Sequence, residues 1–402
     1  MNLEQPCIRI SVRNLVEFIL RHGDIDNRTG GADKEAMQQG GRIHRKIQRQ
    51  QGAEYRAEVS LKYQIACDGF ILSVEGRADG IIELPKRVVI DEIKGVFKDL
   101  KRLKEPQLLH LAQAKCYAYI YAEQKNLEEI GVQMTYCNLD TEEIRRFQEV
   151  YTRAELKKWF EELVSEYEKW ARYQMEWRAK RNASIKTVEF PFEYRDGQKK
   201  LVASVYRTIL RKKKLFIQEP TGVGKTMAAV FPAVKAVGEE LGEKIFYLTA
   251  KTITRTVASQ AFEILRKQDL KMKVITLTAK EKICIQEEMQ CNPESCERAK
   301  GHFDRINEAL YALLTAECEI SRENILLFAE KYKVCPYELS FEAAVWADCI
   351  ICDYNYVFDP HVNRKSLIEG SLRQNIYLID EAHNLLDRAR EMYSADIAKS
   401  DF

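Results

Sequence analysis

The chain of 402 residues is long enough for two or three domains, and its 63 basic side chains nearly balance 61 acidic ones, for a net charge of +2. Composition alone therefore gives no indication of a nucleic-acid partner, which local features must supply. The N-terminus lacks the apolar run of a signal peptide, and no apolar run reaches the roughly 18 residues of a membrane span, so we expect no membrane partner. Eleven cysteines without an export signal indicate reduced thiols in a cytoplasmic protein.

Two strands of a predicted hairpin carry the first group of chemically active side chains. In residues 76–84 and 88–95, polar and apolar side chains alternate as in strands, and Pro85 and Lys86 form the predicted turn between them. Glu92 and Lys94 share one face of the second strand, and Asp79 in the first strand would bring another carboxylate beside them. Two carboxylates and an ammonium can bind Mg²⁺ and activate water for phosphodiester hydrolysis. The alternative interpretation is an ordinary solvated face of charged residues.

Two helices flanking this hairpin add further polar residues. His44 lies on an earlier helix, and Gln113 and Tyr117 share one face of a later helix at i and i+4. In this order the residues resemble the RecB-type branch of PD-(D/E)xK nucleases, although Ala78 replaces that family's frequent Pro. The resemblance implies an α/β nuclease-like domain over residues 1–185 and a DNA substrate. An inert domain that only holds DNA is the alternative. By resemblance, Asp79, Glu92 and Lys94 would be catalytic, and His44, Asp79 and Glu92 would bind the metal.

A long helix is predicted from Thr141 to about Lys180. Its apolar side chains recur at steps of three, four and seven, which places them on one face that we expect to pack on the nuclease sheet. Residues 182–187 lose this periodicity and are predicted to be the linker, with a domain boundary near 185. The apolar positions are Leu156, Phe160, Leu163, Tyr167, Trp170 and Trp177.

A phosphate-binding loop follows the predicted strand Leu215–Gln218 and precedes a helix that begins at Thr226. Backbone N–H groups of a Gly-containing loop can close around a polyphosphate, and the following helix presents its positive N-terminus. Lys225 can reach the β- and γ-phosphates, and the Thr226 hydroxyl can bind Mg²⁺. Glu219 stands where the usual pattern begins with Gly. The residues predicted to surround ATP are Thr221, Gly222, Val223, Gly224, Lys225 and Thr226.

The sequence Asp380-Glu381-Ala382-His383 ends a predicted strand over residues 376–379 in two adjacent carboxylates. Asp380 is suited to hold the Mg²⁺ of bound ATP, and Glu381 to orient or deprotonate the attacking water. Together with the phosphate-binding loop, these residues predict an ATP-hydrolysing site with Lys225, Asp380, Glu381 and His383 as its catalytic residues.

Four cysteines lie between the phosphate-binding loop and this acidic motif. Thiolates at a four-cysteine site suit an iron–sulfur cluster or structural Zn²⁺, and spacing alone does not separate the two. Unligated buried thiols are the third interpretation. Cys318 is a rival ligand, whereas Cys349 and Cys352 lie in an apolar strand that we expect in the core. The predicted metal ligands are Cys284, Cys291, Cys296 and Cys335.

From about residue 190 to residue 390, the motifs resemble the XPD/DinG group of superfamily 2 helicases in their order. The resemblance places Arg195 and Gln198 near adenine, residues 246–252 against single-stranded DNA, and Cys335-Pro-Tyr-Glu at the fourth ligand of a 4Fe–4S cluster. It implies ATP-dependent 5′→3′ translocation on single-stranded DNA or DNA junctions, in repair or replication. Few residues follow His383 in this sequence, so we expect the second RecA-like domain of such a motor in a longer chain or in trans.

The predicted fold class is α/β. Alternation of strands and helices over residues 186–402 predicts a RecA-like domain with a parallel sheet, interrupted by a helical insertion at about 280–340. Two alternatives to the helicase remain: a nuclease regulated by ATP, and a DNA-binding scaffold with an inert nuclease domain. The predicted strands are 215–218, 245–249, 274–277, 349–352 and 377–380.

Overall fold

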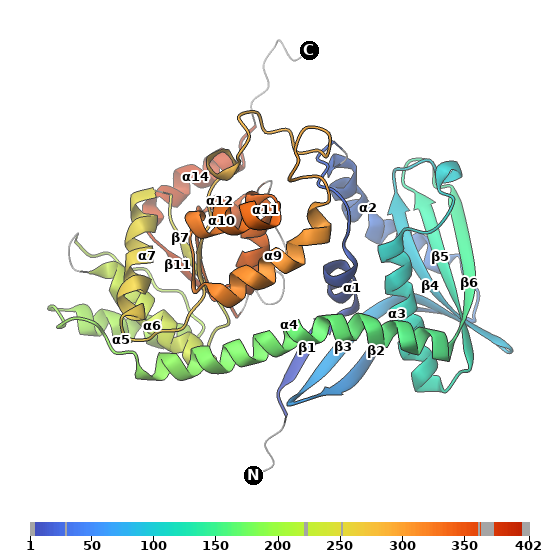
Figure 1. Ribbon diagram of the computed structural model, residues 1–402, viewed down its shortest axis with the longest axis horizontal. Coiled ribbons are helices and arrows are strands. Elements are labelled where there is room, and N and C mark those ends of the chain that lie inside the picture. The colour runs from blue at the N-terminus through green and yellow to red at the C-terminus, as the bar shows by residue number, and fades with distance from the viewer. Residues whose placement is uncertain are drawn as a thin grey trace. The chain divides into compact units, whose positions relative to one another are not determined.

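The computed structural model describes residues 5–28, 30–220, 224–250, 252–360, 362 and 374–395, without the side chains of residues 30–39 and 252–253. Contacts divide the chain into two compact units, residues 1–176 and residues 177–402 (Figure 1). Each unit is built around its own sheet. Within the described ranges, no helix combines the length and the apolar character that crossing a membrane requires.

The first unit is a six-stranded mixed sheet with helices packed on it (Figure 1). Strand β3 (Phe70–Leu84) pairs antiparallel with β4 (Arg87–Val96), which confirms the predicted hairpin. The sheet continues from β4 through β5 to β6 and from β3 to β1, and β2 pairs with β3. The other elements are β1 (Cys7–Ser11), α1 (Val12–Leu20), α2 (Gly30–Arg49), β2 (Tyr55–Cys67), α3 (Leu108–Lys125), β5 (Glu129–Asn138) and β6 (Ile144–Thr152).

Apolar side chains fix the two helices that flank the sheet. Ile43 and Ile47, four residues apart on α2, are buried in a small core with Ile93 of β4. Helix α3 contacts β4 and β5, and its residues from Cys116 to Ala122 are buried. Because Ile43 and Ile47 face the sheet, the intervening His44 is carried close to the strands that hold the carboxylates.

The helix predicted from Thr141 begins later and ends later than expected. Residues 144–152 form β6, which pairs antiparallel with β5, and helix α4 spans Arg153–Thr187. The predicted linker at 182–187 is therefore helical. The predicted apolar face is confirmed in the first unit, because Leu156, Phe160 and Trp170 are almost fully buried.

The second unit contains a parallel five-stranded sheet in the order β11-β7-β10-β8-β9. Its strands are β7 (Ile245–Leu248), β8 (Val274–Thr276), β9 (Glu319–Ile320), β10 (Cys349–Cys352) and β11 (Ile376–Ile379). Its helices are α5 (Gln198–Leu210), α6 (Lys225–Gly238), α7 (Thr252–Arg266), α8 (Lys280–Ile283), α9 (His302–Ala316), α10 (Arg322–Tyr332), α11 (Pro336–Trp346), α12 (Asn355–Phe358) and α14 (Leu385–Met392).

One predicted strand of this unit is absent. Residues Leu215–Gln218 have no regular structure, and Phe216 is 90% exposed. A short apolar run favours a strand only when a neighbouring strand accepts and donates its backbone hydrogen bonds, and no described strand pairs with this segment. The four other predicted strands are confirmed. Cys349 and Cys352 are fully buried in β10, as expected.

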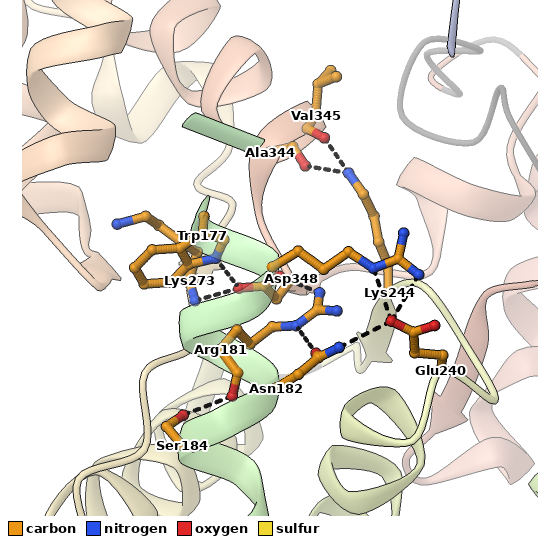
Figure 2. Close-up of polar contacts among 11 residues, drawn as sticks. Trp177, Arg181, Asn182, Ser184, Glu240, Lys244, Lys273, Ala344, Val345 and Asp348 are labelled. Atoms are coloured by element: carbon orange, nitrogen blue, oxygen red, sulfur yellow. Dashed lines mark hydrogen bonds and ion pairs between the residues drawn. The ribbon is translucent and has the colours of Figure 1, made fainter. Parts of the chain in front are cut away.

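The C-terminal part of α4 belongs to the second unit, where its polar side chains converge on Asp348 (Figure 2). Asp348 directly precedes β10 and is 4% exposed. Its carboxylate accepts hydrogen bonds from Trp177 Nε1 at 2.9 Å, from an Arg181 guanidinium nitrogen at 2.7 Å and from the Lys273 backbone N–H at 2.8 Å. The Lys273 ammonium lies 4.0 Å from the centre of the Trp177 ring. These contacts fix the end of α4 against β10.

Candidate functional sites

Asp79 of β3 lies beside the carboxylate-bearing segment of β4. One carboxylate oxygen, Oδ2, accepts a hydrogen bond from the backbone N–H of Ile93 at 2.8 Å. The other oxygen, Oδ1, lies 3.3 Å from Nδ1 of His44 on α2. Gln48, one turn further along α2, donates to the Asp79 backbone carbonyl at 2.9 Å. Helix α2 is therefore fixed to Asp79 at two successive turns.

Glu92, Lys94 and Gln113 form a chain of contacts next to Asp79. Lys94 Nζ lies 2.8 Å from Glu92 Oε1 and donates a hydrogen bond to Gln113 Oε1 at 3.1 Å. Tyr117 covers Gly76, where a β-carbon would lie 2.7 Å from its hydroxyl oxygen. The structure thus brings together all six residues that the sequence predicted for this site.

The second oxygen of Glu92 is the unusual atom of the site. Glu92 is only 1% exposed, and among the described residues its Oε2 has no hydrogen-bond partner. Burial raises the pKa of Glu92 to about 7, against the opposing charge of Lys94. Burial lowers the pKa of His44, but its hydrogen bond to Asp79 and that carboxylate's charge outweigh burial and raise it overall. A buried carboxylate oxygen without a donor is suited to a cation.

A divalent metal fits the donor types present here, because carboxylates are ligands of Mg²⁺ and Mn²⁺ and imidazole is a common ligand of transition metals. In the part of the chain that the structure describes, however, no three His, Cys, Asp or Glu side chains converge closely enough to hold a metal ion. Glu92 instead contacts Lys94, and Asp79 contacts His44.

Gly224 and Gln198 define the edge of the predicted ATP site. Gly224 precedes α6 with a φ of +77°, and a β-carbon there would lie 2.6 Å from Gln198 Nε2. Gln198 Oε1 in turn accepts from the Arg195 backbone N–H at 3.1 Å. Lys225 Nζ donates to the carbonyls of Glu219 at 2.8 Å and Pro220 at 3.3 Å, so it folds back over its own loop. The predicted ATP-binding residues Thr221, Gly222 and Val223 lie outside the described residues.

Asp380 follows β11 and lies close to the start of α6. Its backbone N–H donates to the Leu248 carbonyl at 2.9 Å, which continues the pairing of β11 with β7. The hydroxyl of Tyr247 on β7 interacts with the side chains of both Thr226 and Asp380. Thr226 and Asp380, predicted as ligands of one Mg²⁺, therefore meet at a shared hydroxyl that the sequence analysis did not identify.

The residues after Asp380 adopt a tight turn. Glu381 has a φ of +51°, and His383 Nδ1 lies 3.4 Å from Glu381 Oε2. Tyr354, another residue that the sequence analysis missed, donates from its hydroxyl to the carbonyls of Asp380 and Glu381. No local pattern predicts these two tyrosines, since both act through contacts that are distant in sequence.

The four predicted cysteine ligands are half-buried free thiols. Cys291 and Cys335 are close enough to influence each other's charge, and the Lys280 side chain hydrogen-bonds Cys291. Cys335 occupies the N-cap position of α11 without a side-chain capping hydrogen bond. Burial raises the pKa of its thiol to about 11, although the nearby backbone N–H groups of Tyr337 and Glu338 oppose this. Cys284 ends α8, and Cys296 lies in the loop before α9. Over the described residues, these thiols do not gather into a set of three or more ligands.

Comparison with known proteins supports both halves of this description. Residues 15–184 match the PD-(D/E)XK nuclease superfamily model, and residues 249–402 match the DEAD_2 model. Human "Regulator of telomere elongation helicase 1" is 24% identical over 267 residues, which cover 54% of this chain and 22% of that protein. Chicken "Fanconi anemia group J protein homolog" is 38% identical over 78 residues, covering 19% of this chain and 6% of that protein.

One solved structure with a similar chain is "XPD_Helicase", which is 21% identical with a TM-score of 0.35, covering 49% of this chain and 34% of that one. The chain spans about a fifth of the length of the human relative. The first match covers most of the first unit and ends eight residues into the second, and the other match lies within the second unit. The chain therefore combines a segment similar to the PD-(D/E)XK nuclease superfamily with a segment similar to the DEAD_2 family.

Proposed function

We propose that this chain is the ATP-binding part of a DNA helicase that carries its own metal-dependent DNA nuclease. The helicase part would couple ATP hydrolysis to 5′→3′ movement on single-stranded DNA or DNA junctions, in repair or replication. It would need a second RecA-like domain, from a longer chain or in trans. The boundary between the two parts would lie within α4, where contacts divide the chain after residue 176.

The buried, unpaired Oε2 of Glu92 is the observation that carries the nuclease proposal. His44, Asp79 and Glu92 would hold one or two Mg²⁺ ions. Bound Mg²⁺ would polarise the scissile phosphate and lower the pKa of the attacking water. Lys94 would position this water or the phosphate, and Gln113 holds the Lys94 ammonium from the other side at 3.1 Å. Loading with metal would require Lys94 to move away from Glu92.

In the helicase part, Gly224 and the other loop residues would surround the phosphates of ATP. Lys225 would exchange the carbonyls of its own loop for the β- and γ-phosphates, because a charged phosphate is the stronger acceptor. Thr226 and Asp380 would bind the Mg²⁺ of ATP, and Glu381 would orient the attacking water. Arg195 and Gln198 would contact adenine, and the contact of Gln198 with Gly224 supports that placement.

We further propose that Cys284, Cys291, Cys296 and Cys335 bind a 4Fe–4S cluster, with Zn²⁺ as the alternative. The closeness of Cys291 and Cys335 supports a thiolate site. Anaerobic purification followed by iron and zinc analysis tests it. About four irons, lost in Cys335→Ser and retained in Cys318→Ser, would support the cluster. Zinc alone would make the insertion a zinc module. The absence of both iron and zinc from the purified protein would contradict a metal site.

Calorimetric titration with Mn²⁺ tests the nuclease site without depending on catalysis. We expect the wild-type chain to bind Mn²⁺ at a site that Glu92→Gln loses. The matched control is Glu105→Gln, which removes the same charge from an exposed position of the same unit. Equal Mn²⁺ binding by all three proteins would contradict the proposed metal site.

Two variants separate the helicase from the other two functions. If the protein were chiefly a nuclease regulated by ATP, Lys94→Ala would abolish DNA cleavage and Lys225→Ala would still cut but no longer respond to ATP. If it were a scaffold with an inert nuclease domain, the wild-type chain would retain DNA in an ATP-dependent manner without any metal-dependent cleavage. Hydrolysis of ATP stimulated by single-stranded DNA, and lost in Lys225→Ala, favours the helicase.

A further inference from the structure

Helix α2 carries a row of cations on the face that turns away from the sheet. Arg42, Arg45 and Arg49 follow one another at steps of three and four, so they share one side of the helix. All three are exposed, as are Lys46 and Gln50 beside them. Together these five residues line a hollow of about 520 Å³ on the surface of the first unit.

The opposite face of α2 fixes the direction in which this row points. Ile43 and Ile47 are buried against Ile93 of β4, which leaves the arginines facing solvent. The same helix places His44 Nδ1 at 3.3 Å from Asp79 and joins Gln48 to the Asp79 carbonyl. The row is therefore held in a constant register with the carboxylates of the candidate nuclease site.

The charges of the row are only partly offset within the unit. Lys46 pairs with Glu142, whose carboxylate also interacts with the charge of Arg42, but over the described part of the chain Arg42, Arg45 and Arg49 form no ion pair. Four basic side chains against one carboxylate around one hollow form a local positive field in a protein of nearly zero net charge. Such a field selects a polyanion as its partner.

We propose that Arg42, Arg45 and Arg49 bind the phosphate backbone of a DNA strand and guide it to the site formed by His44, Asp79, Glu92 and Lys94. This inference rests on the proposed nuclease function. The seven residue steps from Arg42 to Arg49 span about 10 Å of helix. Since the phosphates of one strand advance by roughly 3.4 Å each along the axis of duplex DNA, the row covers the axial rise of about three phosphates. Guanidinium groups bind phosphate without reading base sequence, so the row recognises backbone rather than sequence.

An acidic peptide offers the same charge, but nothing places its carboxylates in register with a phosphodiester-cleaving site. A DNA strand on the row, in contrast, lies along the helix that positions His44. The row thus supplies positive charge next to the carboxylate site, where Asp79 and Glu92 would otherwise repel an anionic substrate.

The test compares the full chain with the triple variant R42Q/R45Q/R49Q and with the matched control K62Q/K86Q/K158Q. The control removes the same charge from exposed positions on β2, the β3–β4 turn and α4. Binding of a fluorescent single-stranded oligonucleotide is measured by anisotropy in Ca²⁺ and without ATP, over a series of salt concentrations. Loss of three phosphate contacts should lower the log–log salt slope by about 2 and weaken binding about tenfold or more at low salt. The control should keep the wild-type slope.

An unchanged slope and affinity in R42Q/R45Q/R49Q would overturn the proposal, as would equal losses in the control. A second outcome would also overturn the proposal: the wild-type chain binds a poly-glutamate peptide, R42Q/R45Q/R49Q no longer binds it, and DNA binding is the same in both. That result would assign the row to an acidic protein partner. Hydrolysis of the small diester bis(p-nitrophenyl) phosphate in Mn²⁺ separates this inference from the proposed function. The triple variant should keep that activity and Lys94→Ala should lose it. If the wild-type chain does not hydrolyse the small diester, the nuclease proposal fails. The anisotropy measurement with the oligonucleotide still decides whether the row binds DNA.

Discussion

Arg181 of α4 donates to the carboxylate of Asp348 at 2.7 Å, and both side chains are nearly excluded from solvent. The contact joins the last turns of a 35-residue helix to the residue that directly precedes β10, the central strand of the second sheet. The end of α4 is consequently an integral part of the RecA-like unit rather than a free linker (Figure 2).

Asp348→Ala should therefore destabilise the RecA-like unit by about 3–5 kcal/mol, because it leaves the Arg181 guanidinium buried without its counter-charge. Asp348→Asn, which keeps a hydrogen-bond acceptor, should cost less. The measurement is urea unfolding followed by tryptophan fluorescence, since Trp177 donates to Asp348 directly. Glu240→Gln, which breaks an exposed ion pair with Arg178, is the control and should change stability by about 1 kcal/mol or less. An equal loss of unfolding free energy in Asp348→Ala and Glu240→Gln would contradict this account.

Gly224→Ala should abolish ATP binding. The substitution places a β-carbon 2.6 Å from Gln198 Nε2 at a backbone φ of +77°, so the loop or Gln198 must shift. Gly197 provides a matched control, because it has a φ of +76° but no atom within 4 Å of the added carbon. We expect Gly197→Ala to cost about 1–2 kcal/mol of stability and to leave binding of a fluorescent ATP analogue intact. Similar ATP affinities for both variants would show that Gln198 does not constrain this loop.

His110 should stay uncharged well below neutral pH. Burial lowers the pKa of His110 to about 3, helped by Lys94, Arg13 and Lys98, and its Nδ1 lies 3.2 Å from the Tyr136 hydroxyl. The unfolded chain takes up this proton near pH 6.5, so the native state loses stability as pH falls from 6.5 towards 3, by up to about 1.4 kcal/mol per pH unit. His110→Gln should remove that part of the slope.

Proton NMR of the histidine C2–H resonances checks this directly. One resonance, absent from His110→Gln, should not shift between pH 5 and pH 8. A resonance of His110 that titrates near pH 6.5 would show that the ring is solvated and would remove the predicted contribution to the pH dependence of stability.

The first candidate site could be predicted well from sequence because its geometry is local. A period of two puts Glu92 and Lys94 on one face, and a tight turn brings Asp79 alongside, so the pattern determines the arrangement. The motif resemblance also pointed to Gln198, which lies beside Gly224, and its predicted contact with adenine stays a prediction. The apolar period of α4 fixed which side of that helix is buried.

What the sequence did not predict depends on distant partners. Strand β6 is an edge strand whose many charged residues resemble a helix surface, and only pairing with β5 makes it extended. Residues Leu215–Gln218 show the converse, since an apolar run remains irregular when no described strand pairs with it. Tyr247 and Tyr354 reach Asp380 from β7 and from the residues after β10, a relation that only the order of strands in the sheet creates.

Cleavage of a labelled single-stranded oligonucleotide in Mg²⁺ tests most directly whether the assembled carboxylate site is a working nuclease. We predict that the wild-type chain and Lys225→Ala cut the DNA, that Lys94→Ala and Glu92→Gln lose about 100-fold or more of the rate, and that EDTA abolishes it. Cleavage that persists unchanged in Lys94→Ala and Glu92→Gln, or its complete absence in the wild-type chain with Mg²⁺ or Mn²⁺, would contradict the central claim.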